Sequence, residues 1–297
     1  MNREYRSGFV SILGSPNVGK STLMNALVGQ KVAIATGKAQ TTRNKVTGIL
    51  TRGEYQIVFL DTPGIHTPKN KLGEYMVRTA YEANRDVDAT LLLLDAKVGV
   101  GARDQEILSR LPRRNRLVVI NKIDAISREK LQAIREQLCA LDIVDEQILE
   151  ISATQGTGLA ALEAQIVSLL PPGPQFYPED MVTDRPERFI AAELIREKAL
   201  LNLREEVPHG IGVEIEKIEE LEDLTDVRAL IVCERDSHKG IIIGKKGAML
   251  KKIASEARID LERLFGTQVY LEVFVKVKED WRNSMHMLRE LGYKKEE

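Results

Sequence analysis

The stretch from Gly14 to Ser21 constrains the fold of this chain more than any other part of its sequence. It reads GSPNVGKS, follows the apolar run Phe9–Leu13 and precedes a helical pattern over Thr22–Val28. A G-x-x-x-x-G-K-[ST] pattern between a strand and a helix is typical of a loop that binds phosphate groups. Backbone N–H groups converge at such a helix N-terminus, where the helix dipole also favours negative charge. The sequence therefore predicts a phosphate-binding loop, the alternative being a turn with a chance Gly-Lys-Ser.

Each residue type in this loop has a physical reason to be there. Gly14 and Gly19 let the backbone approach a ligand without a Cβ clash. Lys20 supplies a positive charge for the terminal phosphates, and the Ser21 hydroxyl can hold Mg²⁺. The predicted nucleotide-binding residues of the loop are Gly14, Ser15, Pro16, Asn17, Val18, Gly19, Lys20, Ser21 and Thr22.

Short apolar runs alternate with helical patterns through the first half of the chain. A hairpin is predicted from strands over 46–51 and 55–60, the second of which ends at Asp61. Three further strand-like runs end at Asp95, Asn121 and Ser152. The helical patterns cover 72–83, 102–111, 128–141 and 159–170. This alternation predicts an α/β domain with a mostly parallel sheet and helices on both faces. Ligands of such sheets bind beyond the carboxyl ends of the strands, where these polar residues lie.

Two of these strand-end motifs indicate a guanine nucleotide. In Asp61-Thr62-Pro63-Gly64-Ile65 the carboxylate can reach Mg²⁺ and the Gly64 N–H can point at a γ-phosphate. In Asn121-Lys122-Ile123-Asp124 a carboxylate suits N1 and the 2-amino group of guanine, a donor pair that adenine lacks. An isolated Asn-Lys-x-Asp is more often a capped turn, but its place after a strand favours base recognition. Ser152-Ala153 is expected to offer a backbone N–H to the guanine oxygen.

The bulk composition is that of a soluble, globular chain long enough for two domains. Of 297 residues, 43% are hydrophobic and 29% charged, with a net charge of −1, so any basic surface must be local. Two distant cysteines, Cys139 and Cys233, fit packing roles in a reducing compartment. The polar start, Met1 to Gly8, leaves no room for a signal peptide, and no apolar run approaches membrane-spanning length. We therefore expect a cytoplasmic protein.

A second domain is predicted after a proline-rich break. Pro171-Pro172-Gly173-Pro174 ends the last helix, which gives a first domain over 1–172, a linker over 173–188 and a smaller α+β domain over 189–297. The predicted order is a helix over 189–206, strands over 211–221 and 227–233, helices ending near 256 and 265, a strand over 269–277 and a closing helix over 281–291, with Trp281 as a core anchor.

The segment from Lys239 to Lys252 is the candidate RNA-binding surface of this domain. It holds five lysines and no acid, around a Gly-x-x-Gly that lets the backbone approach a nucleic-acid strand. A lone Gly-x-x-Gly is more often a plain helix connection, but the surrounding order of elements favours RNA. Glu214 to Asp226, with seven acids and one lysine, should repel RNA. The predicted RNA-binding residues are Lys239, Gly240, Ile241, Ile242, Ile243, Gly244, Lys245, Lys246, Gly247, Lys251 and Lys252, with the three isoleucines lying under unstacked bases.

Together these motifs resemble the GTP-binding domain of translation-factor-related GTPases, and the whole chain resembles the Era family of ribosome-assembly GTPases. The resemblance rests on GSPNVGKS at 14–21, QTTR at 40–43, DTPG at 61–64, NKID at 121–124, SA at 152–153 and GIIIGKKG at 240–247. It implies GTP or GDP with Mg²⁺ as ligands and a type II KH domain after the linker. It also implies binding to the 3′ end of small-subunit ribosomal RNA and a role in assembly of the small ribosomal subunit.

The catalytic residues depart from the pattern of small signalling GTPases, which place a water-orienting glutamine after Asp-x-x-Gly. Ile65 stands there, and His66 is expected to be an exposed loop residue. We therefore expect slow intrinsic hydrolysis by a site of Asn17, Lys20, Thr42, Asp61 and Gly64, with Ser21, Thr42 and Asp61 at the metal. Within the expected mobile loop 30–46, Thr42 is the first choice to reach Mg²⁺ and Thr41 the second, while Arg43 is expected to be solvated. In related potassium-activated GTPases an asparagine at the position of Asn17 helps hold K⁺, which makes K⁺ a further candidate ligand.

Two other functions stay open. One is an RNA-binding scaffold in which GTP is mainly structural, because the glutamine is missing. The other is a regulatory GTPase peripheral to the inner face of the cell membrane, which would use the basic region on anionic lipid. We expect a monomer in either case.

Overall fold

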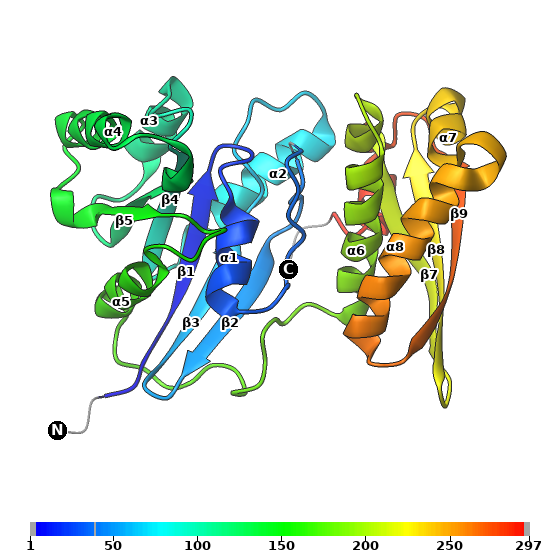
Figure 1. The fold of residues 1–297 in the computed structure, drawn as a ribbon, viewed down its shortest axis with the longest axis horizontal. Helices are drawn as coiled ribbons and strands as arrows, with labels where there is room; N and C mark the ends of the chain where they lie inside the picture. Colours follow the sequence, from blue (N-terminus) through cyan, green and yellow to red (C-terminus); the bar gives the residue numbers. More distant parts are fainter. Residues whose placement is uncertain (1–3, 39, 294–297) are drawn as a thin grey trace. The chain divides into compact units, whose positions relative to one another are not determined.

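A computed structural model describes residues 4–38 and 40–293 of the chain. The N-terminal Met1–Arg3 and the loop residue Ala39 therefore lie outside the described residues. The chain divides into two compact units. The first comprises residues 1–35, 42–67 and 76–184, and the second comprises 36–41, 68–75 and 185–297. Figure 1 shows the elements of both units.

One sheet organises the described part of the first unit, with strand order β2-β3-β1-β4-β5-β6. Only β2 runs antiparallel to its neighbour; the other pairs are parallel, as the alternation of strands and helices predicts. The strands are β1 (Arg6–Gly14), β2 (Val46–Arg52), β3 (Tyr55–Asp61), β4 (Ala89–Asp95), β5 (Arg116–Asn121) and β6 (Ile148–Ile151). The helices are α1 (Lys20–Val28), α2 (Lys71–Glu82), α3 (Ala102–Arg110), α4 (Arg128–Ala140) and α5 (Leu159–Leu169), with short 3₁₀ turns η1 (Ile123–Ala125) and η2 (Asp145–Gln147).

Both faces of this sheet are covered. Val118 and Ile120 of β5 pack with Ile107 of α3 and Ile134 of α4. Alternate residues of a strand point to opposite faces, and Val119 is as fully buried as its neighbours. Because β1, β3, β4, β5 and β6 are parallel, their carboxyl ends lie at the same end of the sheet, which places the polar motifs together.

The stretch predicted as a linker is largely attached to the first unit. Ser7 Oγ donates to Pro174 O at 2.6 Å, and Ile49 N donates to Val182 O at 2.8 Å. Gln56 Oε1 accepts the N–H groups of Phe176 and Tyr177. Composition alone does not reveal these partners, because a proline-rich segment without secondary structure can still be held by side-chain hydrogen bonds.

The second unit contains a three-stranded sheet in the order β7-β8-β9, antiparallel and then parallel. Its core includes Ile195, Ile231, Ile242 and Leu261, and Trp281 is fully buried, as predicted, with Nε1 donating to Gly210 O at 2.9 Å. The elements are α6 (Glu187–Asn202), η3 (Val207–Gly210), β7 (Gly212–Glu220), β8 (Leu224–Cys233), α7 (Asp236–Ile243), η4 (Lys245–Gly247), α8 (Ala248–Phe265), β9 (Gln268–Val277), η5 (Trp281–Asn283) and α9 (Met285–Glu290).

Some sequence predictions are wrong in detail. Residues 248–265 form the single helix α8, not two, because nothing near Glu256 breaks the helical pattern. The helix predicted over 189–206 ends at Asn202, and Val207–Gly210 form a 3₁₀ turn. Cys139 is exposed on the outer face of α4 and fills no packing role, whereas Cys233 is buried.

No helix in residues 4–38 and 40–293 is long and apolar enough to cross a membrane.

Candidate active site and nucleic-acid interface

The loop between β1 and α1 has the conformation that a phosphate-binding loop needs. Gly14 has φ +149° and Gly19 φ +99°, and a Cβ at Gly19 would lie 2.4 Å from Asn121 Nδ2. Gly64 approaches this loop so closely that a Cβ there would lie 2.9 Å from Pro16 Cα. These positions therefore require glycine, as the motif predicts.

Lys20 lies inside this loop. Its Nζ donates to Gly14 O at 3.2 Å and to Ser15 O at 3.1 Å. Burial lowers the pKa of Lys20 to about 8, although the Asp61 charge opposes this effect. An ammonium group that donates to carbonyl oxygens, as Lys20 does, can transfer to phosphate oxygens, which carry full charge.

Three oxygen-bearing side chains converge beside Lys20. Ser21 Oγ donates to Asp61 Oδ2 at 2.6 Å and lies 2.8 Å from Thr42 Oγ1, which is 3.4 Å from the same carboxylate oxygen. Thr41 lies elsewhere: its hydroxyl donates to Lys38 O at 2.7 Å. The geometry thus places Thr42, the first choice, in the cluster.

The cluster suits a hard divalent cation. Asp61 is fully buried, and its Oδ1 has no hydrogen-bond partner in the described residues. Burial raises the pKa of Asp61 to about 6, against the opposing effects of Lys20 and of hydrogen bonds from Ser21 and Thr42. Mg²⁺ prefers one or two protein oxygens together with phosphate oxygens and water. Two hydroxyls and an incompletely satisfied carboxylate fit that requirement.

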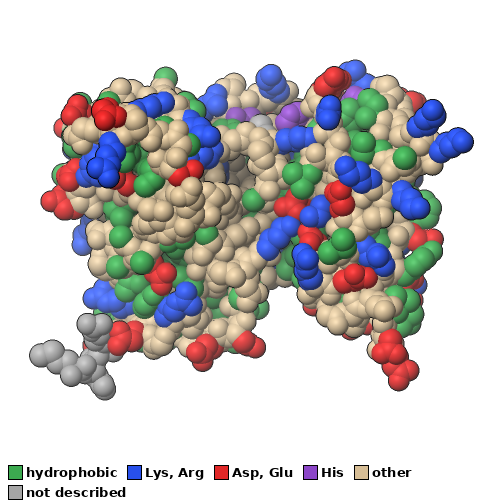
Figure 2. All heavy atoms as spheres, viewed as in Figure 1, with side chains coloured by type: hydrophobic (Ala, Val, Ile, Leu, Met, Phe, Trp, Pro, Cys, Tyr) green, Lys and Arg blue, Asp and Glu red, His purple; other side chains and the backbone are tan. Residues whose placement is uncertain are grey.

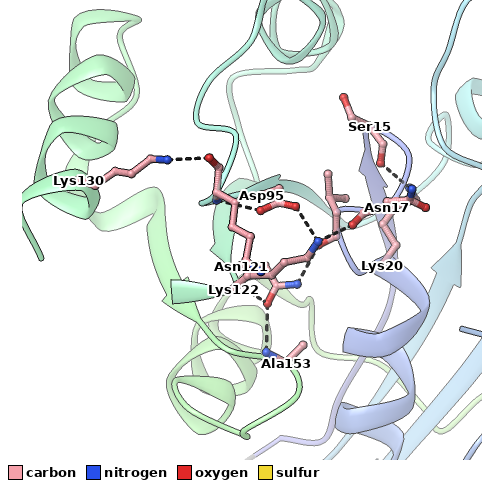
Figure 3. A network of polar contacts seen from close by, with 10 residues as sticks. Ser15, Asn17, Lys20, Asp95, Asn121, Lys122, Lys130 and Ala153 are labelled. Carbon is pink, nitrogen blue, oxygen red and sulfur yellow. Dashed lines mark hydrogen bonds and ion pairs between the residues drawn. The ribbon is translucent and has the colours of Figure 1, made fainter. Parts of the chain in front are cut away.

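Four of the predicted base-recognition residues, Asn121, Lys122, Asp124 and Ala153, line a cavity of about 210 Å³. Asn121 links the three motifs by hydrogen bonds. Its Nδ2 donates to Val18 O at 2.8 Å, and its Oδ1 accepts the N–H groups of Lys122 and Ala153 (Figure 3). The cavity is lined by Gly19, Thr22, Lys97, Asn121, Lys122, Asp124, Ala125, Ala153 and Thr154.

The expected role of Ser152-Ala153 toward the guanine oxygen stays a prediction. The Ala153 N–H donates to Asn121 Oδ1 at 3.0 Å, and the Ser152 N–H donates to Thr157 O at 3.0 Å. Both backbone donors are therefore already used in this conformation. Ala153 of the motif lines the cavity.

Sequence reasoning missed two supporting carboxylates. Asp95 Oδ2 lies 2.6 Å from Lys122 Nζ, which also donates to Asn17 O at 2.6 Å (Figure 3). Asp104 Oδ1 accepts the Ser15 hydroxyl at 2.8 Å. Asp95 pairs with Asn121 in the β4–β5 register, so its place at a strand end was the available signal.

Two loop side chains, His66 and Arg43, are less exposed than the sequence predicts, whereas Ile65 agrees with the expectation. Ile65 is buried in the core, and its N–H donates to Gly14 O at 3.2 Å. His66 is only half-exposed, with Nδ1 2.8 Å from Gly64 O. Arg43 is predicted to be solvated, but its side chain is 1% exposed. It belongs to a buried segment, residues 41–44, which precedes β2. No side chain at position 65 can orient water.

The Gly-x-x-Gly of the second unit lies between α7 and α8. Gly244 has φ +73° and Gly247 φ +78°, and Lys246 between them is also left-handed, with φ +52°. A Cβ at Gly247 would meet none of the described residues within 4 Å, so this side of the turn is open to them. Figure 2 shows Lys and Arg side chains over this end of α7 and α8, and acidic ones at the tip of the β7–β8 hairpin.

The predicted RNA-contacting side chains divide into two groups. Lys245, Lys246, Lys251 and Lys252 are exposed, and Ile241 is 50% exposed. Ile242 is fully buried against Ile253 in the core, so its predicted place under RNA bases is wrong. The helical repeat of α7 turns it inward while its neighbour Ile241 faces solvent.

Comparison with known proteins places both units in known families. Residues 9–122 match the family model described as 50S ribosome-binding GTPase, and residues 206–282 match the KH domain model.

Full-length relatives cover nearly the whole chain. The chain is 52% identical over 293 residues to GTPase Era of Ruminiclostridium cellulolyticum, covering 98% of each chain, and 51% identical to GTPase Era of Alkaliphilus oremlandii, covering 97% of this chain and 99% of that one. Two crystal structures are 42% identical and each covers 97% of this chain and 99% of its own. One is a point variant of Aquifex aeolicus Era bound to GDP·AlF4⁻, with a TM-score of 0.93. The other is Era in complex with MgGDPNP and nucleotides 1506–1542 of 16S ribosomal RNA, with a TM-score of 0.94. With this identity over nearly its whole length, the chain belongs to the Era family of GTPases.

Proposed function

We propose that this chain is a GTP-hydrolysing switch that binds the 3′ end of small-subunit ribosomal RNA and assists assembly of the small ribosomal subunit. The observation that carries the proposal is the arrangement at one sheet edge: a cavity bordered by Asp124 lies beside the loop that holds Lys20. The Era structure with MgGDPNP and 16S ribosomal RNA supports the same pairing of ligands in a relative.

The residues take distinct roles at this site. Lys20 would bind the terminal phosphates, the Gly64 N–H would face the γ-phosphate, and Asp124 would accept the two N–H groups of guanine. Ser21, Thr42 and Asp61 would hold Mg²⁺, which would offset the negative charge of the phosphate oxygens. Ile65 supplies no polar group, so we expect slow turnover without an activator.

A K⁺ ion is a further proposed ligand of this site. Asn17 is exposed in the phosphate-binding loop with φ +65°. A monovalent cation there would neutralise charge between the phosphates as an arginine finger does. Turnover in KCl should exceed turnover in NaCl at the same ionic strength; equal rates would count against the ion.

The second unit would bind single-stranded RNA along the Gly244–Gly247 turn. Its lysines attract the sugar-phosphate backbone, and the open side of Gly247 admits it.

We also propose that the protein is a cytoplasmic monomer. Peripheral association with the membrane is the alternative, and co-sedimentation with anionic liposomes would detect it.

The test is binding of a short single-stranded RNA from the 3′ end of small-subunit ribosomal RNA to protein loaded with a GTP analogue or with GDP. A switch predicts tighter binding with the analogue and faster turnover with RNA, and a scrambled RNA is the control. RNA binding that is indifferent to nucleotide, with unchanged turnover, would favour a scaffold in which GTP is structural. The observation that favours this second function is the buried Ile65, because it has no polar group that could orient the attacking water.

A further inference from the structure

The turn between α3 and β5 concentrates positive charge on the first unit. Residues 110–116 read RLPRRNR, four arginines and no acid in seven residues, in a chain whose net charge is −1. The Arg113 side chain is 81% exposed, and Arg114 is exposed beside it. The nucleotide motifs follow the carboxyl ends of strands, whereas this turn precedes the amino end of β5. Its charge therefore does not serve the bound nucleotide.

The backbone of this turn is fixed. Gln147 Nε2 donates to Arg113 O at 3.3 Å, and Asn115 Nδ2 donates to Asp88 O at 3.0 Å. Asn115 adopts φ +56°, and its carbonyl accepts the Thr90 N–H at 2.9 Å. The two exposed guanidinium groups therefore project from an ordered scaffold, which lowers the entropy lost when they bind a ligand.

Arg116 adds positive charge beneath the turn. It is 6% exposed, its Nε has no hydrogen-bond partner, and no carboxylate lies within ion-pair distance of it in the part of the chain described. Burial and then the Arg113 charge lower the pKa of Arg116, a sign that like charges gather here. A nearly buried arginine without a carboxylate is costly unless an anion approaches it.

The acids near the turn are loosely held. Asp142 lies 3.7 Å from Arg113, with side chains 77% and 81% exposed, and Glu106 pairs with Arg110 in an exposed i,i+4 contact. Such solvated pairs contribute little stability, so phosphate can replace the carboxylates. Arg114 has no ion pair in the described residues.

We propose that the turn Arg110–Arg116 is a second RNA-contact surface, which binds the sugar-phosphate backbone without reading bases. Guanidinium groups match phosphate oxygens in bidentate geometry, which favours a polyphosphate backbone over a single small anion. The identity of this ligand rests on the proposed RNA-binding function, although the surface is separate from the Gly-x-x-Gly turn.

The test uses the full-length protein and a blunt-ended RNA duplex, since the Gly-x-x-Gly turn is expected to bind single strands. Fluorescence anisotropy at several KCl concentrations gives the affinity and its salt dependence. Arg113→Ala/Arg114→Ala should weaken duplex binding roughly tenfold and lower the slope of log K against log salt by about 2, one for each lost phosphate contact. GTP turnover and binding of the single-stranded 3′-end RNA should not change.

The matched control is Arg103→Ala/Arg128→Ala, which removes the same charge from exposed positions at the starts of α3 and α4. If both variants lost the same affinity for the duplex, the effect would be one of net charge and the proposal would be wrong. It would also be wrong if the wild-type chain did not bind the duplex. Vesicles of phosphatidylglycerol form a third arm: a variant that loses vesicle binding but keeps duplex binding would make the turn a lipid contact. Failure of the single-strand binding alone would instead contradict the proposed function.

Discussion

Asp61 shows at the scale of one residue how the site is prepared for a ligand. One oxygen accepts hydrogen bonds from Ser21 and Thr42, whereas the other is buried without a partner in the described residues. A buried polar atom in that condition costs about 1–3 kcal/mol. The protein accepts this cost at the position where a cation would remove it.

Lys20→Ala should weaken GTP binding about 10- to 100-fold, because charge-assisted hydrogen bonds are worth about 1.5–3 kcal/mol. Titration with a fluorescent GTP analogue measures the loss. Arg128→Ala, at an exposed position, is the control and should bind normally. Unchanged affinity in Lys20→Ala would remove Lys20 from the phosphate site.

Asp124→Asn should relax the preference for guanine. The amide retains one acceptor but cannot accept both guanine N–H groups, so GTP affinity should fall on the order of 100-fold while ATP affinity changes little. Competition binding with the two nucleotides tests this, with the exposed Asp86→Asn as control. If selectivity stays as in the wild type, base recognition lies elsewhere.

Glu214 should make stability depend on pH. Burial, then Glu290 and Glu216, raise the pKa of this carboxyl above its ordinary 4.5. A group with a raised pKa in the folded state stabilises the fold at low pH, and this contribution is lost as pH rises through the folded-state pKa. Glu214→Gln should therefore raise the melting temperature at pH 8 and leave it unchanged below about pH 4.5. Thermal denaturation across pH, with the exposed Glu220→Gln as control, would refute this if the gain were the same at every pH.

At the scale of elements, the two glycines of the α7–α8 turn serve different purposes. Both have positive φ, but a Cβ at Gly244 would lie 2.7 Å from Met249 Cβ, whereas a Cβ at Gly247 would contact no residue that the structure describes. One glycine allows close packing within the protein. The other leaves room outside it.

Gly244→Ala should therefore destabilise the fold more than Gly247→Ala. The positive φ costs about 1 kcal/mol at either position, and the clash at Gly244 should add about 1–3 kcal/mol. Urea denaturation of the two variants measures the difference. Equal losses would mean that α8 shifts to accommodate the new methyl group.

The elements that the sequence predicts well are those with strong local signals. The strands β3, β5 and β6, which end at Asp61, Asn121 and Ile151, and the helices between them follow from apolar periodicity and from motif placement. The strand-end position of Asp95 makes it a candidate site residue, but its ion pair with Lys122 and the burial of Ile242 depend on partners far along the chain. The predicted break near Glu256 is wrong because α8 has no glycine or proline in its interior.

At the scale of the whole molecule, the attached stretch 173–184 determines where the first unit ends. A chain truncated after residue 172 loses the hydrogen bonds of Gln56 with Phe176 and Tyr177 and of Ile49 with Val182. It should be less stable than a chain truncated after 184 by about 1–3 kcal/mol, at roughly 1 kcal/mol per lost bond. Thermal denaturation of the two chains compares them, and equal melting temperatures would show that the stretch contributes nothing.

The central place of β1 in its sheet has a consequence for biosynthesis. β1 is made first, but its neighbours β3 and β4 are translated only by residues 61 and 95. At about 5–20 residues per second, its apolar segment waits several seconds for both partners. During that time chaperones can bind the exposed apolar segment. The hydrogen bond from Ile49 of β2 to Val182 can form only after residue 182 has left the exit tunnel, so folding of the first unit is completed late in synthesis.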